Sequence, residues 1–147
     1  MIEGVVITPL KEIKDTRGAV LHMLRSDAET YGGFGECYFS EVLPGCVKAW
    51  KKHTKQTQNL AVPIGGMRLV LYDDRQYSKS KGNLQIIEMG RLLNYVRVTV
   101  PPGIWQGFKC ISEMPSLMAN CANLMHSPEE SESLPVDTDQ IPYNWNP

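Results

Sequence analysis

The chain has 147 residues and a formal net charge of −1, which is enough polypeptide for one domain, so we expect a single domain over residues 1–147. Its 42% hydrophobic and 21% charged residues are typical of a globular protein, and no apolar run approaches the roughly 20 residues of a membrane-spanning helix. The near-neutral charge argues against a nucleic-acid partner, and the N-terminal sequence lacks a secretory leader, which predicts a cytoplasmic protein.

Short β-forming runs bounded by turn residues follow one another along the chain. The first, residues 4–8, is β-branched and ends at Pro9, which cannot donate a ladder hydrogen bond and therefore fits an edge strand. A turn follows in which Asp15 can accept a backbone hydrogen bond and Gly18 can take a positive φ. Nine further strands are predicted, at residues 19–25, 37–43, 46–50, 60–64, 67–72, 84–88, 95–100, 105–111 and 117–123.

This pattern predicts an all-β protein. Turn signals recur about every 8–12 residues, and no helix longer than two turns is indicated, whereas a parallel sheet would need helical crossovers. We therefore expect a cupin-type jelly-roll β-sandwich or barrel, with a ligand site in its open mouth. Residues 127–147 hold five acids and no Lys or Arg, and Ile141, Tyr143 and Trp145 alternate in them, which predicts an acidic tail packed on the barrel.

A basic cluster marks the middle of the chain. Lys48, Lys51, Lys52 and Lys55 fall within eight residues, which indicates a site for a small anion, the alternative being a solvated lysine-rich loop. In one strand register Lys51 faces the interior, where desolvation lowers the pKa of a lysine and makes it a general base. A shift of one residue would instead turn Lys48, Trp50 and Lys52 inward, and the pattern alone leaves both registers open.

The histidines do not form a metal-binding pattern. They are His22, His53 and His126, without a His-x-His pair, and the four cysteines include no Cys-x-x-Cys pair. We therefore expect no metal and no other cofactor. His53 lies among lysines and amides, which suits a base, a phosphate ligand or an exposed imidazole.

Other side chains fit a phosphate or a ring. Arg17, Arg68 and Arg75 can each fork onto a phosphate, although an arginine paired with Asp73 or Asp74 is the alternative. Four aromatic residues can stack on a base or sugar or belong to the core: Tyr38, Trp50, Tyr72 and Trp105.

Four motifs in order resemble the dTDP-4-dehydrorhamnose 3,5-epimerases and their shorter cupin relatives. Residues 15–18 (DTRG) resemble the family's D-x-R-G turn, and residues 45–50 (GCVKAW) lie where the family has G-V-x-R-G-L-H. Residues 73–82 (DDRQYSKSKG) resemble D-x-R-x-x-S-P-T-F-G, and residues 101–108 (PPGIWQGF) resemble P-x-G-x-A-H-G-F. The closing IPYNW at residues 141–145 is similar to the short subgroup.

The resemblance implies a homodimer that binds a dTDP-linked 4-keto-6-deoxyhexose and moves a proton next to its ketone. The family's histidine base aligns with Lys51, with His53 two residues on, so these two are the catalytic candidates. The family's tyrosine acid falls near Asn120, and Gln106 replaces a motif histidine, so the alternative is a catalytically silent cupin that binds a nucleotide sugar or a protein partner. The predicted substrate-binding residues are Arg17, Lys48, Trp50, Gln58, Asn59, Arg68, Tyr72, Gln106 and Asn120.

Overall fold

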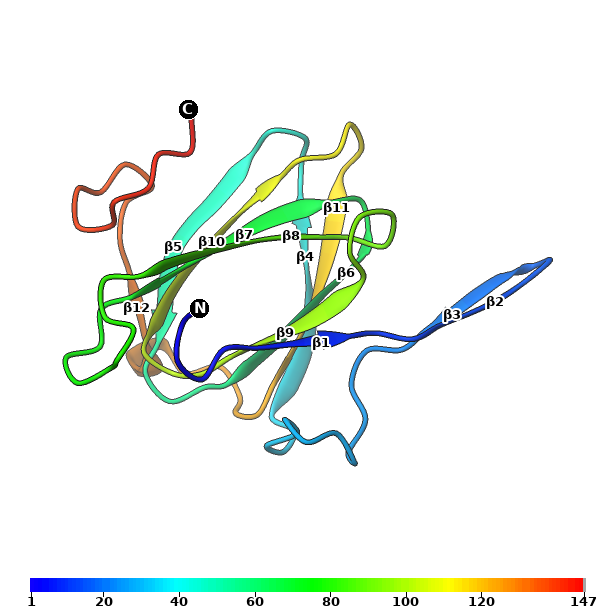
Figure 1. Ribbon diagram of the computed structural model, residues 1–147, viewed down its shortest axis with the longest axis horizontal. Coiled ribbons are helices and arrows are strands. Elements are labelled where there is room, and N and C mark those ends of the chain that lie inside the picture. Colours follow the sequence, from blue (N-terminus) through cyan, green and yellow to red (C-terminus); the bar gives the residue numbers. More distant parts are fainter. Residues whose placement is uncertain (147) are drawn as a thin grey trace.

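Two antiparallel five-stranded sheets face each other in the computed structural model, which describes residues 1–146 (Figure 1). The first, called here the β4 sheet, has the order β1 (Val6–Pro9), β9 (Val96–Val100), β6 (Gln58–Ile64), β11 (Ser116–Ala122) and β4 (Glu36–Val42). The second, the β5 sheet, has the order β12 (Ser131–Ser133), β5 (Val47–His53), β10 (Ile104–Cys110), β7 (Met67–Asp73) and β8 (Leu84–Met89). A hairpin of β2 (Glu12–Asp15) and β3 (Gly18–Leu21) and a short 3-10 helix, η1 (Pro128–Glu130), complete the fold. The predicted all-β jelly-roll class is confirmed.

Most predicted strands are present, and the differences lie at the edges. β1 with Pro9 is an edge strand, as expected from its missing donor. The strand predicted at residues 19–25 ends at Leu21, and two strands were not predicted, β2 and β12. Both missed strands are short and mostly polar, so each depends on pairing with a neighbour rather than on its own β propensity.

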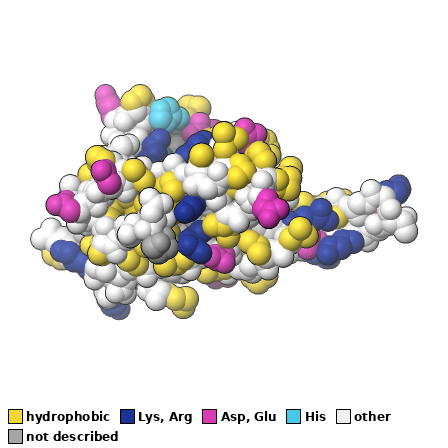
Figure 2. All heavy atoms as spheres, turned by 90° about the horizontal axis from the view of Figure 1, so that it is seen from above, with side chains coloured by type: hydrophobic (Ala, Val, Ile, Leu, Met, Phe, Trp, Pro, Cys, Tyr) yellow, Lys and Arg dark blue, Asp and Glu magenta, His cyan; other side chains and the backbone are white. Residues whose placement is uncertain are grey.

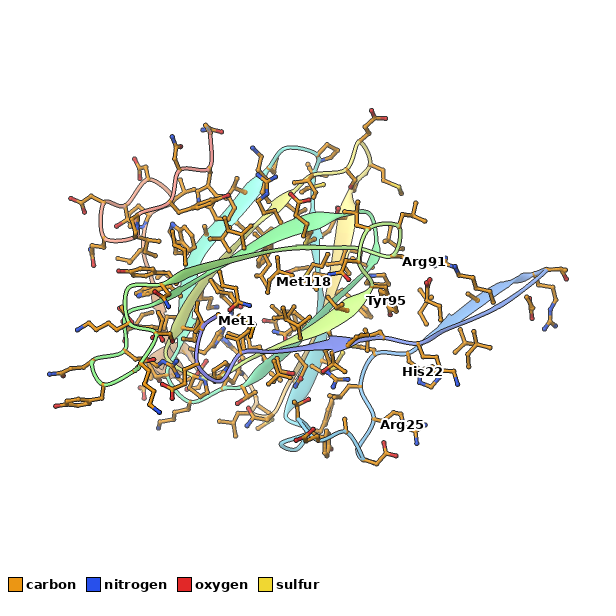
Figure 3. All side chains as sticks on the ribbon, in the orientation of Figure 1. Met1, His22, Arg25, Arg91, Tyr95 and Met118 are labelled. Atoms are coloured by element: carbon orange, nitrogen blue, oxygen red, sulfur yellow. The ribbon has the colours of Figure 1, made fainter. Side chains whose placement is uncertain are left out.

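The core fills the space between the two sheets. Leu60 and Val98 of the β4 sheet meet Leu69 and Ile104 of the β5 sheet there, and all four are buried. Met118 of β11 also lies in this interior (Figure 3). Each such side chain contributes about 1.5–3 kcal/mol through burial, so the packing holds both sheets in a fixed relation. No helix within residues 1–146 is long and apolar enough to cross a membrane.

The acidic tail packs on the outer face of the β5 sheet. Ile141 and Trp145 are buried there against Trp50 and Trp105, and the Trp50 and Trp145 rings lie 5.1 Å apart between centroids. Tyr143 is partly buried in the same cluster. Pro147, the last residue of that predicted tail, lies outside the described residues.

The β2–β3 hairpin projects away from the two sheets (Figure 1) and carries Lys and Arg side chains beyond the main body (Figure 2). Its turn is the predicted one, because the Arg17 backbone N–H donates to Asp15 Oδ1 at 2.7 Å and Gly18 has a φ of +150°. Near its base, Tyr95 Oη donates to the carbonyl of His22 at 2.8 Å (Figure 3). The hairpin is thus tied to the body at one end and free at the other.

Candidate active site

A cavity of about 510 Å³ lies between the two sheets and is lined by side chains of both. The β5 sheet contributes Lys48, Lys51 and His53 from β5, with Gln106 and Phe108 from β10. The opposite wall comes from β4, β6 and β11 of the β4 sheet, with residues Glu36, Tyr38, Ser40, Gln58, Leu60, Met118 and Asn120. His126, Ser133 and Leu134 of the C-terminal segment close one side.

An irregularity in β5 turns both candidate lysines toward this cavity. Lys51 pairs with Gln106 and Lys48 with Phe108, so two residues of β5, Ala49 and Trp50, lie opposite the single Gly107. A Cβ on Gly107 would lie 2.6 Å from the Ala49 Cβ, and glycine therefore makes room for the extra residue. Because of this bulge, side chains of β5 do not alternate strictly between the inner and outer faces. The two registers considered for this strand are therefore not mutually exclusive, and Lys48 and Lys51 both face the cavity.

The other residues of the alternative register lie differently. Lys52 points to the outer face, where its ammonium lies 3.2 Å from Asp74 and 4.6 Å from the centroid of the Trp105 ring. Trp50 borders the cavity but is buried mainly in the outer aromatic cluster with Trp145. Trp50 therefore shapes the wall and does not present its ring face as a free stacking surface.

His53 is the buried histidine of the cavity, with only 5% of its surface exposed. Its Nδ1 hydrogen-bonds to the Glu130 carboxylate, and its Nε2 lies 2.7 Å from Nε2 of Gln58. The Gln58 amide orientation fits its other contacts, since its Oε1 accepts from Gln106 Nε2 at 2.6 Å. An amide nitrogen can only donate, so His53 carries its proton on Nδ1 and has a lone pair on Nε2. This is the protonation pattern of a general base.

Glu130, the buried partner of His53, was not predicted from the sequence. Burial raises the pKa of its carboxyl, but hydrogen bonds from His53 and from the backbone N–H groups of Gln56 and Lys55 outweigh that effect and hold the pKa below its usual value. The side chain therefore stays a carboxylate beside the imidazole. In the sequence Glu130 looks like its exposed neighbour Glu129, and nothing local marks it out.

Two buried amides of the cavity have an acceptor atom without a partner among residues 1–146. These atoms are Gln106 Oε1 and Asn120 Oδ1, in side chains that are almost completely buried. An unpaired buried acceptor costs about 1–3 kcal/mol, so the two oxygens are suited to accept hydrogen bonds from a ligand. Asn120 also donates from Nδ2 to Tyr38 Oη at 2.9 Å.

Three predicted substrate-binding residues of the sheets lie outside the cavity, because strand alternation turns them away. Asn59 points to the far side of β6, where it accepts from Thr99 Oγ1 at 2.8 Å. Arg68 pairs with Glu88 at 2.6 Å, and Tyr72 packs against the outer aromatic cluster. None of these three side chains lines the cavity of this chain.

Arg17 is the fourth predicted ligand that the structure does not bring to the cavity. It lies at the tip of the β2–β3 hairpin, pairs with Asp15 at 2.7 Å, and has 88% of its side chain exposed. The hairpin leads it away from the cavity of its own chain.

Arg75 pairs with Asp73, which was the alternative to a phosphate role. The Asp73 carboxylate is fully buried and accepts hydrogen bonds from the side chains of Arg75, Ser78 and Ser80 at 2.6–2.9 Å. Burial raises the pKa of Asp73, but those hydrogen bonds outweigh it and hold the pKa far below its usual value. This motif therefore fixes the loop after β7 and does not line the cavity. Across residues 1–146, no three His, Cys, Asp or Glu side chains gather closely enough to hold a metal ion.

Two curated proteins are similar to this chain over nearly its whole length. No family model matches this sequence. The chain is 31% identical to a spore coat polysaccharide biosynthesis protein of Bacillus subtilis, over 99% of this chain and 97% of the relative. It is 34% identical to a probable low-salt glycan biosynthesis epimerase of Haloferax volcanii, over 99% of this chain and 95% of the relative.

Solved structures share the whole fold. A dTDP sugar isomerase of Desulfovibrio desulfuricans G20 is 45% identical and superposes with a TM-score of 0.96, covering 98% of this chain and 92% of the isomerase. The dTDP-6-deoxy-D-glucose-3,5-epimerase of Legionella pneumophila, solved with dTDP-4-keto-L-rhamnose, is 20% identical with a TM-score of 0.86, covering 99% of this chain and 80% of the epimerase. The Legionella epimerase shares the fold with this chain, whereas the Desulfovibrio isomerase shares the sequence as well.

Proposed function

The chain belongs to the dTDP-4-dehydrorhamnose 3,5-epimerase-like family, and on that premise we propose that it is a cytoplasmic epimerase or isomerase of a dTDP-linked 4-keto-6-deoxyhexose. The reaction moves a proton at a carbon next to the ketone of the sugar. The observation that carries this proposal is the buried His53–Glu130 pair in the cavity between the sheets. A base with an oriented lone pair is what removal of a carbon-bound proton requires.

His53 is the proposed base. The Glu130 carboxylate accepts a hydrogen bond from the Nδ1–H group, which keeps the lone pair on Nε2 and stabilises the imidazolium formed when Nε2 takes a proton. Gln58 donates to that same lone pair at 2.7 Å, so a bound sugar displaces this contact when its carbon-bound hydrogen approaches Nε2.

The two lysines supply positive charge on the wall that carries His53. Removal of the proton leaves an enolate, and a fixed cation lowers the energy of that developing charge. We assign this role to the half-buried Lys51, and contact with the diphosphate to Lys48, which is exposed at the cavity mouth. Lys51 thus keeps a catalytic role, as a stabiliser of negative charge beside the base.

Gln106 and Asn120 are the proposed hydrogen-bond partners of the sugar. Their unpaired oxygens, one on each wall, accept from hydroxyl groups of a ring held between the sheets. Gln58 completes this polar surface through its contact with Gln106.

A homodimer is the proposed assembly, because it gives the hairpin a surface to contact. Ile13 and Val20 on the hairpin are 47% and 60% exposed, although both are large apolar residues. We propose that the hairpin packs on a second copy of the chain and that Arg17 at its tip reaches the diphosphate bound by that copy.

Deuterium exchange tests the proposed function. In D₂O, the protein is expected to incorporate deuterium into dTDP-4-keto-6-deoxyglucose at C3, C5 or both, with exchange followed by proton NMR. The control is the same mixture without protein, because carbons next to a ketone exchange slowly on their own. Exchange no faster than in that control would mean that the proposed function is wrong.

Mixed dimers test the role of Arg17. Arg17→Ala and His53→Asn are each expected to inactivate the protein, but in a mixed dimer one of the two sites combines an intact Arg17 with an intact His53. Random pairing of equal amounts makes half of the dimers mixed, so about a quarter of the wild-type rate should return on co-expression. As a control, co-expression of His53→Asn with Glu130→Gln pairs two defects of one chain's site and should restore nothing if Arg17 works across the dimer and these two residues do not. No recovery with Arg17→Ala would place Arg17 outside the partner's site.

A further inference from the structure

Tyr38 lies on the cavity wall opposite His53. Tyr38 belongs to β4 of one sheet and His53 to β5 of the other, and both line the cavity between the sheets. The cavity that both residues line has a volume of about 510 Å³, which is enough space for a sugar ring. Groups on the two walls therefore meet opposite faces of such a ring.

We infer that Tyr38 is the proton donor that completes inversion at the carbon from which His53 removes a proton. The inference rests on the proposed function. Inversion of a stereocentre requires removal of the proton from one face and delivery from the other, so the base alone cannot complete it. The β4 sheet forms the cavity wall opposite the strand that carries His53.

The contact with Asn120 positions the Tyr38 hydroxyl for this step. Asn120 is the register partner of Tyr38 on β11, has 2% of its surface exposed, and donates from Nδ2 to Tyr38 Oη at 2.9 Å. Because the phenol oxygen accepts this hydrogen bond, its own O–H hydrogen remains available for the ligand. The same Asn120 donor stabilises the phenolate that forms when the proton leaves.

This arrangement explains how the site works with an asparagine at position 120. An amide cannot give up a proton at neutral pH, but it can hold a neighbouring phenol. The tyrosine comes from the adjacent strand, so β4 supplies the acid and β11 its support.

The other polar groups of the cavity fit this step less well. Lys48 and Lys51 lie on the wall that carries His53, and His126 lies in the exposed segment after β11. Glu36 shares the wall with Tyr38, but no hydrogen bond among residues 1–146 holds its carboxylate in place. Glu36 therefore serves as the matched alternative in the test.

The proton transfers balance without a further reagent. Nε2 of His53 takes the proton of the carbon next to the ketone, the C–H electron pair forms the enolate C=C bond, and the C=O pair moves onto oxygen. The enolate carbon then takes the Tyr38 proton on its other face while the C=O bond re-forms. The protein is left with an imidazolium and a phenolate, and exchange with solvent resets both.

The Tyr38→Phe variant separates the two half-reactions, because it keeps the ring and removes only the hydroxyl. With dTDP-4-keto-6-deoxyglucose in D₂O, formation of the inverted product is expected to fall about 10²–10³-fold. Substrate recovered in its original configuration should still gain deuterium, because deuterated His53 can return the label to the face it attacked. The control is Tyr77→Phe, at a tyrosine that is 92% exposed and outside the cavity, which should keep inversion within about twofold of wild type. Glu36→Gln tests the competing donor on the same wall and should lower inversion far less than Tyr38→Phe does.

Each other result overturns the inference. If Tyr38→Phe still inverts the substrate at the wild-type rate, another group is the proton donor. If Glu36→Gln loses inversion while Tyr38→Phe keeps it, that donor is Glu36. Loss of inversion and of deuterium uptake together in Tyr38→Phe means that the hydroxyl serves binding or proton removal. Wild-type protein without any exchange refutes the proposed function itself, a result that the variants cannot imitate.

Discussion

The His53→Asn variant is expected to lower deuterium incorporation into dTDP-4-keto-6-deoxyglucose by about 10³-fold, because it removes the only base with an oriented lone pair in the described cavity. Asparagine fills much of the same volume and remains polar, so the buried network with Gln58 and Glu130 loses little packing. The rate is measured by proton NMR in D₂O at saturating substrate. A thermal unfolding curve checks that the variant is folded.

Lys51→Ala is the matched comparison, since Lys51 lies on the same strand and the same cavity wall. Because the proposed role of Lys51 is to stabilise the enolate, Lys51→Ala should lower the exchange rate by about 10–10²-fold, which is a smaller loss than that expected for His53→Asn. The opposite ranking, with Lys51→Ala inactive and His53→Asn partly active, would make Lys51 the base. Full activity in both variants would exclude both residues.

The positions of most strands along the chain and their approximate limits could be predicted because each depends on local signals. Pro9 marked an edge strand, and the glycines at 65 and 66 marked the turn between β6 and β7. The register of β5 could not be predicted in the same way. It depends on Gly107 of the paired strand β10, where a side chain would collide with Ala49, and sequence alternation within β5 carries no trace of that contact.

The candidate site was predicted in part for a related reason. Lys48, Lys51, His53, Gln58, Gln106 and Asn120 all reach the cavity. Whether His53 is buried or exposed depends on Glu130, which lies 77 residues away in the chain. A lone histidine among lysines does not reveal such a partner, so the sequence favoured Lys51, at the motif position, over His53.

The alternative of a silent cupin depended on residues missing from the expected positions. The base was expected at position 51 and the acid at position 120. The cavity instead has a histidine two residues along the same strand and a tyrosine on the strand next to β11. In the mechanism proposed above His53 and Tyr38 take the two roles, so a change of residue at one position does not by itself mean a loss of the reaction.

The Glu130→Gln variant is expected to lower the exchange rate by about 10²–10³-fold, although Glu130 does not touch the substrate. A glutamine amide can donate to Nδ1 of His53, which favours the form with the proton on Nε2 and removes the lone pair from the reacting side. The loss should therefore appear in kcat rather than in KM. Glu129→Gln, a change at the exposed neighbouring residue, should leave both constants within about twofold of wild type.

The same variant should also lose stability, in a way that depends on pH. The carboxylate accepts hydrogen bonds from His53 and from two backbone N–H groups, and their loss should lower the free energy of unfolding by about 2 kcal/mol at pH 7. Since the folded protein holds the pKa of Glu130 below its ordinary value of 4.5, the unfolded chain binds the proton more readily. The stabilisation is therefore fully present above that value and is lost as the pH falls through the lower pKa of the folded state.

Urea unfolding of wild type, Glu130→Gln and Glu129→Gln across this range measures the effect. The difference between wild type and Glu130→Gln should be constant near neutral pH and shrink in acid, whereas Glu129→Gln should follow wild type throughout. A stability difference that persists unchanged in acid would mean that packing, rather than the ionised carboxylate, is what Glu130 contributes. In that case the loss of kcat would have to arise from a displaced His53, and Glu130→Asp, which keeps the charge on a shorter side chain, would rescue neither property.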